Sequence, residues 1–503
     1  MKLAAIKNYF ANWREWEMNP IVIKELRQGV RSWTVTGMLL LFLVVLFIAS
    51  LAFLITSSFD VNANMGLGGS MFKVFLAILA GASVFFIPLY TAVRVAAERQ
   101  ENNPDLLYVT TLSPFRIIFG KFLCSAYITL LFFSACMPFM AFTNLLRGVD
   151  LPTVFFILAF LFLIVCASNM IAIFFACLPA SRPFKILFAI GGFIMSFWVV
   201  LPVVISFQFM ESGIGAMMGR RDFWIGTITT TGLVLMVTGL FFVLSVALIS
   251  PPSANRALPV RTYLTGVWLL TGLLAFGWVA QTGDAERMTA WVYPTFIVMM
   301  FALLVTISNH DLLSQRVRRK IPQSQLKRFF AFFFFNGAAG GLIWVAAILV
   351  ITFGIDGVMN KHFPRASYPS TFAVEGHGWY VTTGLYAFDY ALLALFLQRK
   401  YFRHRPAKLA GLLAVLLAGG WALAPGIFLF FANRLSWKSI DGFQPGNIFN
   451  VFSLSEGSDQ MKHQVTAMIW LVVMLFINAK WFRQQVKNFQ PPPAVENVPP
   501  VLQ

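Results

Sequence analysis

The stretch TVTGMLLLFLVVLFIASLAFLITS, residues 34–57, decides the fold class, because it is a long apolar run without one charged side chain. A transmembrane α-helix needs about 20 such residues to cross the hydrocarbon core of a bilayer. Eleven further runs of roughly 17 to 25 mostly apolar residues follow along the 503-residue chain. With 58% hydrophobic and 12% charged residues, the sequence predicts an all-α polytopic membrane protein with about 12 transmembrane helices.

The expected spans divide the chain into two halves of six. We expect a cytoplasmic segment over 1–33, a six-span domain over 34–250, a second six-span domain over 251–482 and a proline-rich disordered cytoplasmic tail over 483–503. Pro202 lies inside the fifth run, which predicts a bend or a re-entrant segment there. The runs lie near 34–57, 72–94, 117–142, 152–178, 186–207, 224–249, 263–280, 291–308, 330–354, 380–397, 409–431 and 465–480.

Basic residues set the expected orientation, since Lys and Arg near the ends of spans are retained on the cytoplasmic side. With the N-terminus inside, 28 of the 38 Lys and Arg residues fall on that side. The net charge of +18 then follows from topology, and the charge is not gathered on one folded face as nucleic-acid binding requires. We therefore expect a multi-pass protein of the cytoplasmic (inner) membrane, with both termini cytoplasmic and no nucleic-acid partner.

The segment before the first span, NPIVIKELRQGVRSW (residues 19–33), has the pattern of an amphipathic helix. Asn19 suits the cap and Pro20 the first turn. Apolar residues recur at helical spacing on one side and polar residues on the other, which predicts a helix lying along the inner membrane surface. The alternative is a basic anchor that only fixes topology. The apolar side holds Ile23, Leu26, Val30 and Trp33, and the polar side holds Lys24, Arg27, Gln28 and Arg31.

The inner loop ERQENNPDLLYVTTLSPFRIIFGK (residues 98–121) predicts a second short helix. Asn103, Pro104 and Asp105 form a helix start, and Ser113-Pro114 ends the helix. Leucines on such a short rod at the cytoplasmic face would form an apolar surface for a partner. The alternative is a loop helix resting on lipid headgroups.

In these two stretches the chain resembles the permease subunit of ABC-2-type transporters. The resemblance covers about the first 125 residues closely, and the six-span plan extends it to about 250. It implies that residues 19–33 are the elbow helix and that the loop is the coupling helix, which seats in a separate cytosolic ABC ATPase. The matching positions are Asn19, Pro20, Lys24, Glu25, Leu26, Arg27 and Gln28 in the elbow, and Glu98, Arg99, Leu106, Leu107, Thr110, Leu112, Ser113, Pro114, Gly120 and Lys121 in and beside the loop. Asp105, at the expected helix start, is assigned to the coupling helix as well.

The match has departures. The family commonly has Gly-Thr-Leu-Glu where this chain has Asn102, Asn103, Pro104 and Asp105, which leaves the start of the coupling helix open. In the second half, NHDLL (residues 309–313) echoes NPDLL (residues 103–107), which favours a degenerate six-plus-six repeat, although this half lacks an evident elbow.

The chain shows no pattern for chemistry of its own. It contains no G-x-x-x-x-G-K-[ST] loop, so we expect no enzyme activity and no cofactor, with ATP hydrolysis on the partner subunit. Its four cysteines fall inside expected spans, and the histidines near Asp356 and Glu375 do not have metal-ligand spacing. Asp389 is the one acid well inside a span, so it belongs either to a translocation path or to the bundle core as a neutral, hydrogen-bonded acid.

Three functions stay open on the sequence. The first is the membrane subunit of an ATP-driven exporter, embedded in the bilayer and paired with a cytosolic ATPase and with a second permease chain. The second is a twelve-span secondary transporter, against which the scarcity of intramembrane acids and histidines argues. The third is a membrane-embedded transferase, for which no acidic pair at a span end is evident.

Overall fold

The computed structural model describes residues 20–59, 67–101, 113–146, 149–178, 190–191, 194, 218–309, 313–363, 378–431, 444–453 and 457–492. Over these ranges the regular secondary structure is helical, with no β-strand. Eleven of the described helices are long and apolar enough to cross a membrane. The chain is therefore an all-α polytopic membrane protein, which confirms the predicted fold class. It divides into two compact units, Met1–Pro251 and Pro252–Gln503.

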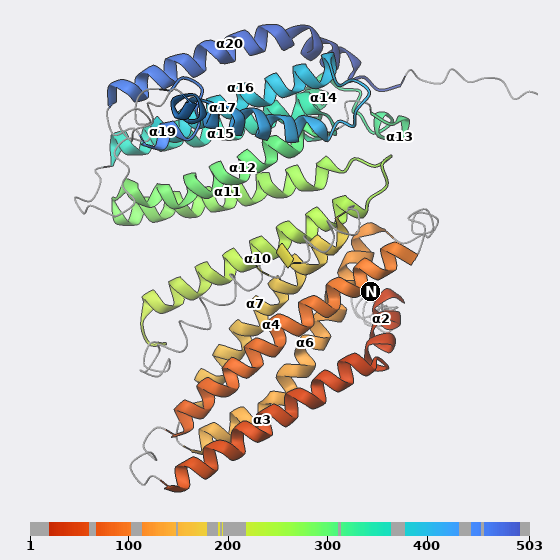
Figure 1. Ribbon diagram of the computed structural model, residues 1–503, viewed down its shortest axis with the longest axis vertical. Helices are drawn as coiled ribbons and strands as arrows, with labels where there is room; N and C mark the ends of the chain where they lie inside the picture. Colours follow the sequence, from red (N-terminus) through yellow and green to blue (C-terminus); the bar gives the residue numbers. More distant parts are fainter. Residues whose placement is uncertain are drawn as a thin grey trace, which may run out of the picture. The chain divides into compact units, whose positions relative to one another are not determined.

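The first unit begins with a short helix that is followed by long ones (Figure 1). Four of the long helices correspond to the first four expected spans and the last corresponds to the sixth. The fifth expected span, 186–207, lies outside the described residues except at 190–191 and 194. The helices are α2 (Pro20–Val30), α3 (Trp33–Phe59), α4 (Leu67–Glu101), α6 (Pro114–Leu145), α7 (Leu151–Cys177) and α10 (Arg221–Ile249).

The core of the first unit lies where α7 packs against α4, α6 and α10. Phe75 of α4, Phe132 of α6 and Leu161 of α7 are fully buried there. Inside this apolar core Asn169 donates a hydrogen bond from Nδ2 to Thr129 Oγ1 at 3.0 Å, which joins α7 to α6. Such interhelical hydrogen bonds stabilise helix pairs in membranes by about 1 kcal/mol.

Among its described residues, the second unit contains six helices that are long and apolar enough to span a membrane, together with shorter helical segments (Figure 1). In it α16 packs against α20, α17 and α12, and α12 packs against α15. The helices are α11 (Ala257–Thr282), η2 (Ala285–Met288), α12 (Thr289–Ile307), α13 (Gln315–Arg318), α14 (Gln325–Phe334), α15 (Ala338–His362), α16 (Gly378–Lys400), α17 (Leu409–Phe431), α19 (Asn450–Ser453) and α20 (Gly457–Asn488).

The expected span 330–354 is broken in the structure, so its start was wrongly predicted. Helix α14 ends at Phe334, and α15 begins at Ala338 after Gly337, whose φ of 135° is unfavourable for other residues. Asn336 holds the chain out of helix, because its Oδ1 accepts the N–H of Ala257 at 2.8 Å and its Nδ2 donates to the carbonyl of Ala254 at 3.0 Å. The apolar run thus becomes a short amphipathic helix followed by a span.

Arg261 of α11 stabilises this break through hydrogen bonds to its backbone carbonyls. It is buried, and its Nη1 donates to the carbonyl oxygens of Phe333 at 2.8 Å and Phe335 at 2.7 Å. Its Nη2 donates to the carbonyl of Gly337 at 3.2 Å. The carbonyls at the end of a helix lack intrahelical partners and carry partial negative charge, so a guanidinium is a favourable cap.

Candidate functional site

Helix α2 lies against α6 through a face that the two-sided sequence pattern did not identify. Val22, Glu25 and Gly29 are buried, whereas Ile23 and Trp33, on the predicted apolar side, are exposed. A helix with a buried protein-facing side and an exposed apolar side suits a position between the bundle and the lipid. The structure thus confirms the predicted helix over Pro20–Val30 and adds a contact face that contains a carboxylate.

That carboxylate belongs to an ion cluster of Lys24, Glu25, Arg94, Glu98 and Lys121. Lys121 Nζ on α6 donates to Glu25 Oε1 on α2 at 2.8 Å and also to Glu98 Oε2 on α4. Lys24 Nζ lies 3.5 Å from Glu98 Oε1, and Arg94 Nη2 lies 3.7 Å from Glu25 Oε2. The cluster therefore joins three helices through two carboxylates and three cations.

Arg94 extends this cluster to a further residue of α2. Its Nη2 donates to Gln28 Oε1 at 2.5 Å, and its Nη1 donates to Tyr90 Oη at 2.9 Å within α4. Its guanidinium also lies 5.7 Å from the centroid of the Tyr90 ring. Both Glu25 and Gln28 of the predicted elbow are therefore fastened to α4.

Burial makes this cluster a strong joint. The Glu25 side chain is 7% exposed and that of Lys121 is 11% exposed, whereas Lys24 is 59% exposed. Removing one partner of a buried ion pair costs about 3–5 kcal/mol, because the other charge is left uncompensated. An exposed pair contributes about 1 kcal/mol or less. Most of the energy that holds α2 in place is thus expected from Glu25 and Lys121.

A cavity of about 20 Å³ lies beside the cluster, lined in part by Thr91, Cys124 and Ser125. A single water needs roughly 10–15 Å³ of such volume, so the cavity has room for about one water. The cluster therefore links α2, α4 and α6 around a cavity of single-water size.

The cluster unites part of the predicted elbow with the two stems of the predicted coupling loop. Glu98 lies near the C-terminal end of α4, and Lys121 lies in the second turn of α6. Ser113 caps α6 by accepting the N–H of Arg116 at 3.4 Å, and Pro114 is its first residue. Glu98 therefore lies near the end of α4, and Ser113 and Pro114 begin α6.

Other predicted residues lie outside the cluster or outside the described residues. Arg27 is exposed and Leu26 packs against the apolar core of the first unit. Asn19 and the loop residues lie outside the described residues. For Pro20 and Arg99 the structure describes the backbone only. The loop residues concerned are Asp105, Leu106, Leu107, Thr110 and Leu112.

Sequence reasoning missed Arg94, which was counted only as the end of an apolar run. A signal was present, because Arg94 and Glu98 are four residues apart and so share one face of a helix. It missed the role of Glu25 as well, because the amphipathic pattern placed Glu25 on neither side and the motif named it only as an elbow residue. The residues that Arg94 and Glu25 contact on neighbouring helices cannot be deduced from spacing along the chain.

Asp389 of α16, the other predicted site residue, is 2% exposed in the second unit. Neither carboxylate oxygen has a hydrogen-bond partner among the residues that the structure describes. The hydrogen-bonded core acid that one interpretation expects is therefore not observed. An unpartnered polar group in an apolar interior is unfavourable by about 1–3 kcal/mol.

Other polar residues of the second unit are engaged in pairs between helices. Tyr380 donates to Asp356, and His463 bonds Tyr386 Oη at 3.0 Å and Asn450 Oδ1 at 3.1 Å. In the described parts of the chain no group of three or more His, Cys, Asp or Glu side chains is placed to hold a metal ion.

Comparison with known proteins identifies no relative of this chain. The chain matches no protein family, no curated protein and no solved structure. Conclusions about function therefore depend on the sequence motifs and on the geometry of the site.

Proposed function

We propose that this chain is the membrane-spanning permease subunit of an ATP-driven, ABC-2-type exporter in the cytoplasmic (inner) membrane, coupled to a separate cytosolic ATPase. The motifs around residues 19–28 and 98–121 motivate the proposal. The chain has no nucleotide-binding loop of its own, so ATP hydrolysis belongs to the partner. The ATPase contact is assigned to residues 102–112, with Leu106 and Leu107 as docking side chains.

The observation that carries the proposal is that Lys121 forms hydrogen-bonded ion pairs with both Glu25 and Glu98. A loop that is displaced by an ATPase must move the spans with it. A loop that is not fixed to the spans would move without them. Glu98 and Lys121 stand on the two stems of residues 102–112, so their ion pair closes the base of this loop. Glu25 adds α2 to the same joint.

A displacement of the loop would therefore move α4, α6 and α2 together. Helices α4 and α6 both pack against α7 in the core of the first unit, which gives a contiguous route into the bundle. This contiguous route supports coupling between the loop and the spans. An effect of substitutions in the loop on transport would demonstrate that coupling.

The test is a pair of double substitutions followed by copurification of the ATP-hydrolysing partner. Leu106→Asp with Leu107→Asp places charges in the expected apolar cleft and should abolish partner binding while the chain still inserts into the membrane. Tyr401→Asp with Phe402→Asp is the matched control, because these adjacent residues are exposed, lie outside any span and are distant from residues 102–112 along the sequence. Unchanged copurification of the partner with the leucine variant would contradict the proposal.

A secondary transporter that works without ATP is the second candidate, and the buried Asp389 favours it. A carboxyl group inside a span that has no hydrogen-bond partner is the kind of group that proton or cation coupling uses. This candidate requires transport by the purified chain alone, driven by an ion gradient. Loss of that transport in Asp389→Asn would support it, and transport that needs ATP and a second subunit would exclude it.

A further inference from the structure

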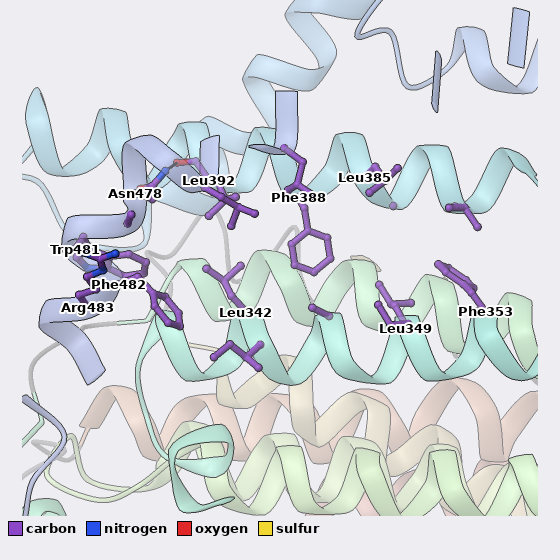
Figure 2. A pocket seen from close by; sticks show the side chains of 18 residues that line it. Leu342, Leu349, Phe353, Leu385, Phe388, Leu392, Asn478, Trp481, Phe482 and Arg483 are labelled. Carbon is purple, nitrogen blue, oxygen red and sulfur yellow. Dashed lines mark hydrogen bonds between the residues drawn. The ribbon is translucent and has the colours of Figure 1, made fainter. Parts of the chain in front are cut away.

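An apolar groove with a basic end lies among three helices of the second unit. Its volume is about 510 Å³, within the range of roughly 300–1,000 Å³ that ligand sites occupy. Helices α15, α16 and α20 form its walls. Figure 2 shows Phe388 of α16 pointing into the space between α16 and α15, with Leu349 and Phe353 opposite.

The length of the groove corresponds to one leaflet of a bilayer. Along α15 its lining runs from Leu342 to Phe353, which is roughly 16 Å at 1.5 Å per residue. Half of a hydrocarbon core of about 30 Å is about 15 Å. An extended acyl chain of a membrane lipid therefore fits along the groove.

One end of the groove lies at the level expected for lipid headgroups. Asn478, Trp481 and Arg483 of α20 line this end (Figure 2). Tryptophan is enriched at the membrane–water interface, and basic residues gather there on the cytoplasmic side. The guanidinium of Arg399 stacks on Trp481 at 4.1 Å, so this aromatic wall is held by a second basic residue.

The polar groups of the wall are occupied by the protein itself, except at the rim. Asn478 Nδ2 donates to the carbonyls of Leu392 and Met474, and its Oδ1 accepts from Arg399. Arg399 Nε in turn donates to the carbonyl of Leu395 at 2.9 Å. Arg483 is exposed at the groove end and takes no part in these hydrogen bonds of Asn478 and Arg399.

Charge complementarity identifies the headgroup. The segments 394–408 and 479–492, which surround the groove end, contain eight Lys and Arg residues and no Asp or Glu. The field at this end therefore favours an anion, and each basic residue near such a surface contributes about 1 kcal/mol.

We propose that the groove between α15, α16 and α20 binds an anionic phospholipid of the bilayer, with one acyl chain along Leu349 and Phe388 and the phosphate at Arg483. The inference is independent of the ATPase coupling proposed above, since it needs only a membrane-spanning chain. It assigns to the second unit a ligand site that the sequence motifs do not address.

The test uses the full-length chain in detergent micelles that contain equal amounts of palmitoyl-oleoyl phosphatidylglycerol and phosphatidylcholine. Native mass spectrometry counts the lipids retained. The unmodified chain should retain phosphatidylglycerol in preference to phosphatidylcholine. Arg483→Gln should weaken retention of phosphatidylglycerol about fivefold, which corresponds to about 1 kcal/mol. Lys480→Gln, which removes the same charge from an exposed position of α20 outside the groove, should weaken retention clearly less than Arg483→Gln does.

Blocking the groove supplies the second arm. Val350 lines the groove and is 69% exposed, so Val350→Trp fills the groove without disturbing the core. It should abolish retention of both lipids. Ile351→Trp is the matched control, because Ile351 is the next residue of α15, is 47% exposed and does not line the groove. Gel filtration of each variant checks that the fold is intact.

Two results would overturn the proposal. One is equal retention of the two lipids by the unmodified chain together with no effect of Val350→Trp. The other is a change in the number of protein chains per particle in Val350→Trp with lipid retention unaltered, which would assign the groove to a protein contact.

Discussion

Replacing Lys121 by Met removes the one cation that bonds both carboxylates of the ion cluster and leaves an unbranched side chain that is one atom shorter. Glu25 is then buried at 7% exposure, with Arg94 at 3.7 Å as its remaining cation. Breaking a buried ion pair costs about 3–5 kcal/mol, and because one cation remains beside Glu25 we expect a loss of about 3 kcal/mol. For a unit of 251 residues, 1 kcal/mol shifts the melting temperature by about 2–4 °C, so we expect a decrease of about 6–12 °C.

The assay is thermal unfolding of the detergent-purified chain, followed by the fraction that remains monodisperse in gel filtration after heating. Lys24→Met is the control within the same cluster, because Lys24 is 59% exposed and its pair contributes about 1 kcal/mol or less. Glu25→Gln with Lys121→Met should recover much of the loss, since no carboxylate of α2 is then left uncompensated. Equal shifts for Lys24→Met and Lys121→Met would refute the assignment of the buried pair as the joint.

Three further predictions address the second unit and the topology. Arg261→Met should destabilise the chain by about 2–4 kcal/mol in the same thermal assay, because three carbonyls at the break between α14 and α15 lose a donor; an unchanged melting temperature would show that the cap is dispensable. Asp389→Asn should alter stability by less than about 1 kcal/mol, because neither carboxylate oxygen has a hydrogen bond to lose, and a loss above about 2 kcal/mol would indicate a structural partner. In a background without the native cysteines, a cysteine at Ser367 should react with an impermeant thiol reagent added outside and one at Ser324 should not; the reverse labelling would invert the orientation.

Apolar run length predicts most spans well, because the thickness of the hydrocarbon core fixes how many apolar residues a helix needs. The run 409–431 coincides with α17, and the run 152–178 differs from α7 by one residue at each end. The run 330–354 fails for a tertiary reason. Its phenylalanines continue the apolar pattern through Asn336, whose side chain bonds to residues near 255 and so ends the helix.

The candidate site was predictable only in part. The motifs indicated Glu25, Glu98 and Lys121 as members of two separate segments, and the amphipathic pattern predicted the helix that carries Glu25. Their meeting point depends on how α2, α4 and α6 pack, which a single sequence does not specify. The lipid groove was not predictable for the same reason, because Leu349, Phe388 and Arg483 come from three helices that are distant along the chain.

The most direct test of the central claim is the native mass of the complex purified from membranes through a tag on this chain. We predict two permease chains with two ATP-hydrolysing subunits, because ABC ATPases work as a pair, each seated on one coupling helix, and residues 98–121 match the coupling motif far better than residues 309–313 do. One permease chain with two ATPases would instead assign the second docking site to residues 309–313. A stable permease without any ATPase, under every co-expression tried, would contradict the account.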